Sequence, residues 1–288
     1  MNSFILALIA IASCNFLKAE IERLDSVTKP WEHTTYEENI FKDWTERDIK
    51  SLLTLKDDIF VRDEPFLYVK AAENFDSRTQ WPSCVHAIRD QSNCGSCWAH
   101  ATSEVFSDRA CIEGIDTNFV ASVQQLVSCD TADSGCDGGM EYNAFKYIES
   151  KGIVADSCYP YVSGNGKTYT CDNNKISACS VHHYGKNTKS ISSSGIMAEI
   201  KANGPVTTGF MVYADFMTYK SGIYVPTSSQ QEGLHAVKIV GYGNSNGIDF
   251  WSIANSWGTS WGESGFFRIK MGSKCNIESR VYSIQVAK

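Results

Sequence analysis

Apolar residues recur with a helical spacing in the first half of the chain and form short strand-like runs in the second half. Residues 97–112 carry Trp98, Ala101, Val105 and Ile112 at helical spacing, and residues 140–151 continue as a helix until Gly152. Another helix is expected over 195–202, before Gly204-Pro205. Beyond it, apolar or alternating runs split by Gly and Asn predict strands at 206–212, 236–240, 250–254, 266–270 and 281–286. A helical lobe followed by a β-rich lobe is an α+β fold.

The chain begins with a short apolar run that is typical of a secretory leader. Residues 4–12 are apolar throughout, but the run is too short to span a bilayer. Small residues offer cleavage after Cys14 or after Ala19. We expect a signal peptide over residues 1–19 and entry into the secretory pathway.

Residues 20–72 differ in composition from the rest of the chain. They contain no cysteine, and they are charged and helix-prone around 37–53. Thr45 and Asp48 have the spacing of a capping box before Ile49 and Leu52. The segment is either a plain helical extension or a pro-segment that covers a site until it is removed. We favour the pro-segment, with its end near Lys70 to Glu73 and a peptidase domain over 73–288.

Charge and cysteine content narrow the class further. The 288 residues carry a net charge of −7 and no basic run, which excludes the electrostatic pattern of a nucleic-acid-binding protein. No later stretch is apolar enough to span a membrane. Eleven cysteines indicate an oxidising compartment. If Cys14 leaves with the leader, Cys97 is reactive and Cys275 stays unpaired, eight cysteines remain for four disulfides: Cys84, Cys94, Cys111, Cys129, Cys136, Cys158, Cys171 and Cys179.

Cys97 has the sequence setting of a reactive thiol. It follows a glycine-containing turn and stands at the expected start of a helix, six residues after Gln91. The positive end of a helix lowers the pKa of a thiol, and the thiolate is the nucleophilic form. The Gln91 amide could donate to charge that develops on a substrate carbonyl.

A base and its orienting group are expected in the β-rich half. His235 and Asn255 flank the turn-like run 241–248, and a hairpin with its loop near Ser245 would place the two side chains opposite each other. An Asn oxygen that accepts from one ring nitrogen would turn the other nitrogen toward the thiol. A Cys97/His235 ion pair near neutral pH is then expected.

These motifs together resemble the papain-like cysteine peptidases (peptidase family C1). Gln91 with Cys97-Trp98, then residues 233–236, then residues 255–258 occur in the order of that family. The finer detail is similar to the cathepsin B branch, in stretches that run from about Glu73 to the end of the chain: 75–82, 88–91, 107–109, 135–139, 196–200, 203–206, 261–267 and 275–279.

The resemblance implies a two-lobe fold, with a helical N-terminal lobe, a β-barrel-like C-terminal lobe and the active site in the cleft between them. It implies a cysteine-type endopeptidase made as a secretory zymogen, which acts through an acyl-enzyme without cofactor or metal. Cys97 would be the nucleophile, His235 the acid and base, and Asn255 its orienting residue, while Gln91 and the Cys97 N–H would form the oxyanion hole. Trp257 would shield the His235–Asn255 pair, and the substrate-binding set would be Gly138, Gly139, Met140, Gly209, Ala236, Trp257 and Arg280.

The resemblance also implies the covalent frame and the partners. The implied disulfides are Cys84–Cys111, Cys94–Cys136, Cys129–Cys171 and Cys158–Cys179. The implied partners are protein and peptide substrates, the pro-segment as inhibitor and cystatin-like inhibitors, with no nucleic acid, no membrane and a monomeric state. Lysosome-like acidic vesicles or the extracellular space would be its location.

Two departures from the cathepsin B pattern bear on specificity. That branch has a disulfide-closed occluding loop with two histidines that blocks the primed side, whereas the chain has no histidine between Cys158 and Cys179. We expect the loop to be missing and endopeptidase activity to prevail. Arg280 stands where the branch has an acid at the floor of the S2 pocket, near Met140, Gly209, Ala236 and Glu141. P2 is then expected to be apolar or acidic and not basic, unless Arg280 turns outward or pairs with Glu141.

The sequence also allows alternative interpretations of His100, of the Cys94/Cys97 pair and of the function. His100 stands where the family usually has an aromatic residue, and it is either a buried neutral histidine or a group that tunes the Cys97 thiolate. Cys94 and Cys97 with His100 could form a redox or zinc cluster, but that reading leaves Gln91, His235 and Asn255 unexplained. A catalytically weak or inactive papain-fold binding protein is the alternative from another functional class.

Overall fold

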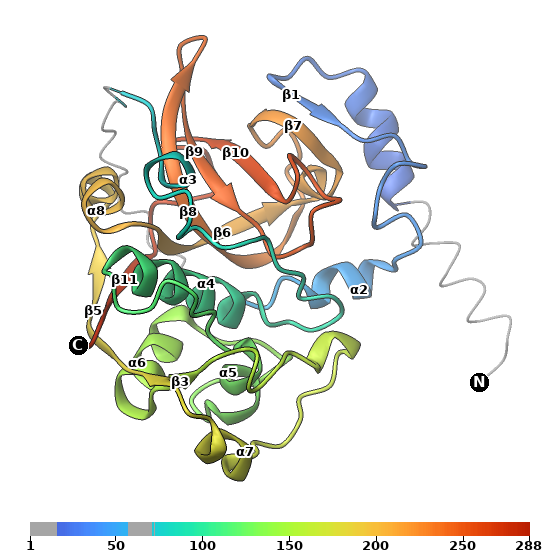
Figure 1. Ribbon diagram of the computed structural model, residues 1–288. Coiled ribbons are helices and arrows are strands. Elements are labelled where there is room, and N and C mark those ends of the chain that lie inside the picture. Colours follow the sequence, from blue (N-terminus) through green and yellow to red (C-terminus); the bar gives the residue numbers. More distant parts are fainter. Residues whose placement is uncertain (1–15, 57–70, 72) are drawn as a thin grey trace, which may run out of the picture.

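The computed structural model describes residues 16–56, 71 and 73–288. The apolar core of the expected leader and residues 57–70, before the expected end of the pro-segment, lie outside the described residues. The described chain has a helical lobe and a β-rich lobe, the α+β arrangement predicted from the sequence. Figure 1 shows α4 between the sheet and the other helices of the helical lobe.

The long helices begin and end close to the predicted residues. α4 (Cys97–Ile112) has the predicted bounds, and α6 (Glu141–Lys151) ends at Gly152, whose φ of +73° suits glycine. α5 (Val123–Cys129) was not expected; it begins where Ser122 Oγ accepts a hydrogen bond from the Gln125 N–H. The shorter helical segments are α3 (Ser77–Gln80), η1 (Ser163–Asn165), α7 (Asn173–Ala178), η2 (Ser193–Gly195), α8 (Ile196–Asn203) and η3 (Ala214–Thr218).

The β-rich lobe is built on one large sheet. Its strand order is β1-β7-β10-β9-β8-β6-β11-β5, with β2 paired to β8. The strands are β1 (Trp31–His33), β2 (Phe75–Asp76), β5 (Gly185–Ile191), β6 (Val206–Tyr213), β7 (Tyr219–Tyr224), β8 (Gln231–Ser245), β9 (Ile248–Ala254), β10 (Phe266–Lys270) and β11 (Val281–Val286). β3 (Ile153–Val154) and β4 (His182–His183) form a separate pair. The sequence pattern missed β5 because its residues are largely polar and exposed or half-exposed. It missed β7 because Lys220, Ser221 and Gly222 interrupt the apolar pattern, although the ends of the strand are buried.

The β8–β9 hairpin turns later than expected. The turn residues are Asn246 and Gly247, both at positive φ, and Ser245 pairs with Ile248. A two-residue turn of this kind matches the twist of the flanking strands. With this turn and a bulge between Ile239 and Gly241, His235 is not directly opposite Asn255 in the ladder, and the expected register is wrong.

Residues 16–56 pack against the β-rich lobe. A helix over 16–25 buries Leu17, Ile21 and Leu24 in the same hydrophobic core as the sheet. β1 extends the sheet by pairing with β7, and α2 (Glu46–Ser51) begins with the predicted capping box of Thr45 and Asp48. In Figure 1 this blue segment runs along one side of the sheet toward α4.

Four disulfides join the loops and helices. They are Cys84–Cys111, Cys94–Cys136, Cys129–Cys171 and Cys158–Cys179, the four pairs that the resemblance implied. Among the described residues, Cys97 and Cys275 are free and buried. Because Cys94 is bonded to Cys136, Cys97 has no Cys-x-x-Cys redox partner in this structure.

Candidate active site

Cys97 is the first residue of α4 and lies at the boundary of the two lobes. Gly95, two residues before it, fits only a glycine, because a Cβ there would come within 2.3 Å of the Cys136 carbonyl oxygen. The Cys94–Cys136 disulfide fixes the same turn. The turn and the helix therefore hold the thiol at the positive end of the α4 dipole.

An ion-pair network joins α4 to β8. Lys238, three residues after His235, donates to Asp108 Oδ2 at 2.7 Å and lies 3.4 Å from Glu104 Oε2. All three side chains are buried. The network fixes the helix that carries Cys97 relative to the strand that carries His235.

His235 on β8 and Asn255 after β9 are brought together by side-chain reach across the hairpin. His235 Nε2 donates to Asn255 Oδ1 at 2.7 Å, and the same oxygen accepts from the Ser256 N–H at 2.8 Å. This bond leaves His235 Nδ1 as the ring atom available to a reacting thiol. Nδ1 is buried and makes no hydrogen bond of normal geometry to a described residue. The Leu52 carbonyl lies near the ring and raises the pKa of His235, against the larger effect of burial.

Trp257 covers the His235–Asn255 pair. Its ring is stacked on the His235 imidazole at 4.8 Å between centroids, and it is 4% exposed. Phe41 of the N-terminal segment packs edge-on against the same tryptophan at 5.3 Å. Water is thereby excluded from the hydrogen bond that orients the imidazole.

The amide N–H₂ group of Gln91 donates to two backbone carbonyls, one of them in the N-terminal segment. Nε2 donates to the Leu52 carbonyl at 3.2 Å and to the Cys94 carbonyl at 3.0 Å, while Oε1 accepts from Ser256 Oγ at 2.7 Å. The Ser256 hydroxyl therefore decides which end of the amide faces the cleft. Sequence reasoning missed this role of Ser256, although the residue stands inside the Asn255–Gly258 motif.

The N-terminal segment runs through the cleft over Cys97. The Leu55 N–H donates to the Leu234 carbonyl at 3.2 Å, and the Lys56 N–H donates to the Gly139 carbonyl at 2.9 Å. Both contacts belong to parallel bridges, Thr54 with Leu234 and Leu55 with Gly139. The backbone N–H of Thr54 lies close enough to the Cys97 thiol to favour its thiolate, as do those of Ala236 and Trp98.

The expected substrate-binding residues line this covered cleft. Gly138 has a φ of +106°, and a Cβ on it would lie 2.1 Å from the Thr54 carbonyl oxygen, while a Cβ on Gly139 would lie 2.6 Å from the Trp98 ring. Met140 follows in the same wall, where its N–H donates to Asp133 Oδ1 at 3.0 Å. The absence of a side chain at Gly138 lets a passing backbone lie against this wall, and its absence at Gly139 lets the wall pack on Trp98.

Leu55 fills the pocket expected for a P2 side chain. It is 5% exposed and belongs to the same hydrophobic cluster as Ala236. Its Cδ2 atom lies 2.3 Å from the position that a Cβ on Gly209 would take. Glu141, which is fully buried, borders the same space, since its Oε1 atom lies 3.8 Å from that position.

Arg280 lies inside this part of the cleft. The side chain is 6% exposed, its Nη1 atom donates to the Lys56 carbonyl at 3.4 Å, and its guanidinium lies over the Tyr282 ring at 5.6 Å. The reading in which Arg280 turns outward is therefore wrong.

Burial under the N-terminal segment opposes the charged forms of both catalytic candidates. Desolvation by burial raises the pKa of Cys97 to about 11. Burial likewise lowers the pKa of His235 to about 4, although the hydrogen bond that His235 donates to Asn255 favours the protonated ring. In this covered form, burial therefore favours the neutral thiol and the neutral imidazole over the ion pair expected from the sequence.

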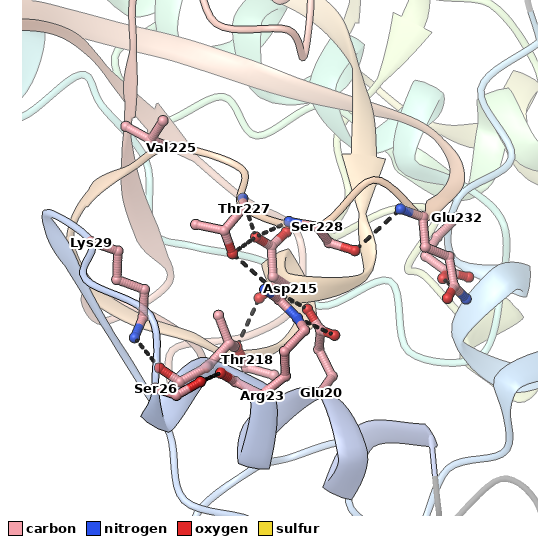
Figure 2. A network of polar contacts seen from close by, with 12 residues as sticks. Glu20, Arg23, Ser26, Lys29, Asp215, Thr218, Val225, Thr227, Ser228 and Glu232 are labelled. Carbon is pink, nitrogen blue, oxygen red and sulfur yellow. Dashed lines mark hydrogen bonds and ion pairs between the residues drawn. The ribbon is translucent and has the colours of Figure 1, made fainter.

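Polar contacts anchor the beginning of the same segment on the β-rich lobe (Figure 2). Arg23 pairs with Glu20 at 2.6 Å and donates to Thr227 Oγ1 at 2.9 Å. Thr227 in turn donates to the buried Asp215, which also accepts from Tyr224 at 2.6 Å. The helix over 16–25 is thus held by an apolar face and by a polar network at its edge.

Comparisons with known proteins identify the family. Residues 71–285 match the family described as "Papain family cysteine protease". The chain is 36% identical over 294 residues to "Cathepsin B-like CP3" of Giardia intestinalis, covering 98% of each chain. It is 38% identical over 252 residues to "Gut-specific cysteine proteinase" of Caenorhabditis elegans, covering 78% of this chain and 77% of the relative.

Solved structures agree with the sequence relatives. "proCathepsin B S9 from Trypanosoma congolense" superimposes with a TM-score of 0.82 at 31% identity, covering 94% of this chain and 97% of that chain. A digestive procathepsin L2 of Tenebrio molitor shares the fold with a TM-score of 0.76 at 24% identity. Among the described residues, no helix is both long and apolar enough to cross a membrane. The chain belongs to the papain family of cysteine proteases; its sequence relatives include cathepsin B-like proteins, and its structural neighbours include procathepsins.

Proposed function

We propose that the chain is a secretory zymogen of a cysteine endopeptidase, with Cys97 as nucleophile, His235 as acid and base, and Asn255 as the residue that orients His235. The proposal rests on one observation above all. His235 and Asn255 share a 2.7 Å hydrogen bond, the N–H of Ala236 next to His235 lies close to the Cys97 thiol, and residues 52–56 cover this site. A base held by a third group beside a thiol is the arrangement that nucleophilic catalysis needs.

The chemistry runs through a thioester. The Cys97 thiolate attacks the carbonyl carbon of the scissile bond, and the oxyanion accepts hydrogen bonds from Gln91 Nε2 and the Cys97 N–H. The His235 imidazolium gives its proton to the leaving amine as the C–N bond breaks. His235 then takes a proton from water, which attacks the thioester and releases the acid product and the free thiol.

Residues 52–56 act as the inhibitor in this proposal. The Leu52 carbonyl accepts a hydrogen bond from Gln91, and the Leu55 side chain occupies the P2 pocket. The Lys56 N–H donates to the Gly139 carbonyl, a contact expected of a substrate backbone. The bridges run parallel to Leu234 and Gly139. The inhibitory segment thus makes the polar contacts expected of a substrate. We expect its removal, with the new N-terminus near Glu73, to open the cleft.

The start of the pro-segment follows from the buried face of its first helix. Leu17 is 2% exposed in the core that the helix shares with the sheet, and cleavage after Ala19 would remove it. Cleavage after Cys14 would keep all the described residues of this helix. In place of the boundary after Ala19 expected from the sequence, we therefore propose that the secreted zymogen begins at Asn15, which the mass of its N-terminal peptide measures; a sequence starting at Glu20 would contradict this boundary.

We infer that internal cleavage outweighs the removal of C-terminal dipeptides. The stretch between Cys158 and Cys179 contains no histidine and is tied down by two disulfides. Beyond Trp257 a half-open cavity of about 390 Å³ lies between the pro-segment and a rim that includes Asp90, Ser92 and Asn93. Among the described residues that line this cavity none is cationic, so they offer no positive group for a substrate carboxylate.

The expected outcome is a rate difference between two matched peptides. For the activated enzyme, we expect kcat/KM on an internally quenched peptide with an amidated C-terminus to exceed that for dipeptide release from the free-acid form by about tenfold or more. Mass spectrometry of the products assigns the bonds cut. Dipeptide release at the rate of internal cleavage would contradict the endopeptidase proposal.

Arg280 is the proposed reason for a P2 preference that is apolar or acidic. Its buried guanidinium beside the Leu55 pocket would repel a basic P2 side chain. We expect Arg280→Glu to shift the ratio of kcat/KM for P2-Arg over P2-Leu peptides upward by about 10- to 100-fold, the size of one charge-assisted contact. Lys270→Glu, an exposed change of equal charge on β10, is the control. An unchanged ratio would show that Arg280 does not determine P2 selectivity.

The alternative of an inactive papain-fold protein lacks a supporting observation. All four residues expected to act, Gln91, Cys97, His235 and Asn255, are present and converge. The proposal also includes what the resemblance to the family implies: delivery to vesicles or to the extracellular space, a monomeric state, and inhibition by cystatin-like proteins.

A further inference from the structure

His100 lies one helical turn after the nucleophile and is 1% exposed. Its Nδ1 atom is 3.0 Å from the Ser96 carbonyl oxygen and 3.2 Å from Ser96 Oγ. The ring packs edge-on against Tyr161, with 4.9 Å between centroids. The imidazole thus joins the residue that precedes Cys97 to a tyrosine from a different loop.

The contacts continue from Tyr161 to Gln91. The Tyr161 hydroxyl donates to the Gln91 backbone carbonyl at 2.9 Å and lies 3.0 Å from Ser96 Oγ. A phenol has one proton to donate, so Ser96 Oγ is the donor toward Tyr161. Since the Ser96 carbonyl can only accept, His100 Nδ1 carries the ring proton. The donors therefore run in one direction, from His100 through Ser96 and Tyr161 to the Gln91 carbonyl.

His100 is neutral in this setting. Burial, with a smaller contribution from Arg89, lowers the pKa of His100 to about 3. The ring is then a fixed donor of one hydrogen bond and carries no charge toward Cys97. A phenylalanine, the kind of residue that the family usually has here, would fill the space but donate nothing.

We propose that His100 and Tyr161 are positioning residues that hold the Gln91–Cys97 turn, and with it both donors of the oxyanion hole, in catalytic geometry. The inference rests on the proposed function. Ser256 holds the far side of Gln91 through its hydroxyl and its backbone carbonyl, the latter at 2.9 Å from the Gln91 N–H. Tyr161 holds the Gln91 carbonyl, and Ser96 stands directly before the Cys97 N–H. The turn is therefore held from two sides, by Ser256 and by Tyr161. Of these two residues, only Ser256 belongs to a motif that the chain shares with the papain-like family.

The experiment compares His100→Phe, His100→Asn, Tyr161→Phe and the double variant His100→Phe/Tyr161→Phe. Asparagine keeps an N–H donor near the position of Nδ1. Each variant is made as the full chain and activated. Tyr147→Phe removes the hydroxyl of a tyrosine on α6 that contacts Gln125, and it serves as the matched control.

Three readouts separate positioning from packing and from tuning of the thiol. The first is the split between kcat and KM on an internally quenched peptide. The second is the inhibition constant of a peptide aldehyde, whose adduct with Cys97 carries an oxyanion. The third is the pH profile of Cys97 alkylation by iodoacetamide, which needs the thiolate but no oxyanion hole.

We expect His100→Phe and Tyr161→Phe each to lower kcat and weaken aldehyde binding by about three- to tenfold, the loss of one buried neutral hydrogen bond. KM and the alkylation profile stay as in the unmodified enzyme. The double variant loses no more than either single variant, because both break one chain of contacts. His100→Asn recovers most of the loss, and Tyr147→Phe has no effect.

Unchanged kcat and aldehyde binding in both single variants would show that His100 only fills space. A shifted alkylation profile with unchanged aldehyde binding would show that His100 tunes the thiolate; either result overturns the inference. If His100→Phe does not fold, Tyr161→Phe alone decides, since it deletes one atom of the same chain of contacts. Absence of hydrolysis by the unmodified enzyme would instead refute the proposed function.

Discussion

Cys97→Ala is expected to abolish peptide hydrolysis and to leave the chain as an unprocessed zymogen wherever processing depends on its own activity. Loss of the nucleophile removes the covalent route, and a loss of kcat on the order of 10⁵ to 10⁶ is the scale known for such deletions. The thiol is buried beneath residues that leave on activation, so its removal costs little packing in the active form. The measurement is hydrolysis of an internally quenched peptide after activation by an added protease.

Cys275→Ala is the matched control for that experiment. Cys275 is the other free cysteine among the described residues, and it is equally buried, but it lies in the core of the β-rich lobe. We expect its replacement to leave kcat within a few-fold of the unmodified enzyme. Equal losses in the two variants would mean that the thiol of Cys97 has no chemical role.

Gln91→Ala is expected to lower kcat by about 10²- to 10³-fold, the usual effect of removing one oxyanion-hole donor. In the zymogen its amide donates to the Leu52 carbonyl, which shows that the group can reach a carbonyl placed in the cleft. The donor acts on charge that develops in the transition state, so KM should change little. Steady-state kinetics on one peptide measure both constants.

Ser256→Ala provides a graded comparison for Gln91. The Ser256 hydroxyl donates to Gln91 Oε1 at 2.7 Å, and its loss frees the amide to rotate while keeping the donor present. We expect a smaller loss of kcat than in Gln91→Ala, about tenfold. If Gln91→Ala instead raised KM and left kcat unchanged, Gln91 would act in ground-state binding of the substrate.

The sequence was sufficient for the large elements of the fold. α4 and α6 follow from helical spacing and from Gly152, and the central strands β6, β9, β10 and β11 follow from apolar runs. β5 carries polar and mostly exposed residues, and the apolar pattern of β7 is interrupted by Lys220, Ser221 and Gly222. Pairing with neighbouring strands, rather than the side-chain pattern, therefore makes them strands. The helix over 16–25 was not expected, because its buried face exists only against the sheet.

The candidate site was predictable in its residues but not in its environment. Gln91, Cys97, His235 and Asn255 stand in contiguous motifs, whereas the positions of Tyr161 and of the Leu55 side chain depend on long-range packing. The expected His235–Asn255 register was wrong because the hairpin turns later, at Asn246-Gly247, and the bulge at Ile239–Gly241 makes up only part of the shift. Side-chain reach across the hairpin still brings the two residues into contact. The pKa directions of Cys97 and His235 could not be predicted, because they come from burial by a segment far away in sequence.

The central claim is that residues 52–56 cover a thiol that becomes the nucleophile when they leave. The most direct measurement is the rate of Cys97 alkylation by iodoacetamide at pH 7, located by peptide mass spectrometry, in the intact zymogen and in the chain cleaved near Glu73. We predict slow labelling in the zymogen, where the pKa of Cys97 is raised to about 11, and fast labelling at Cys97 after cleavage, with loss of hydrolysis in step with labelling. Equal labelling rates in the two forms, or labelling of Cys97 that leaves hydrolysis intact, would contradict the claim.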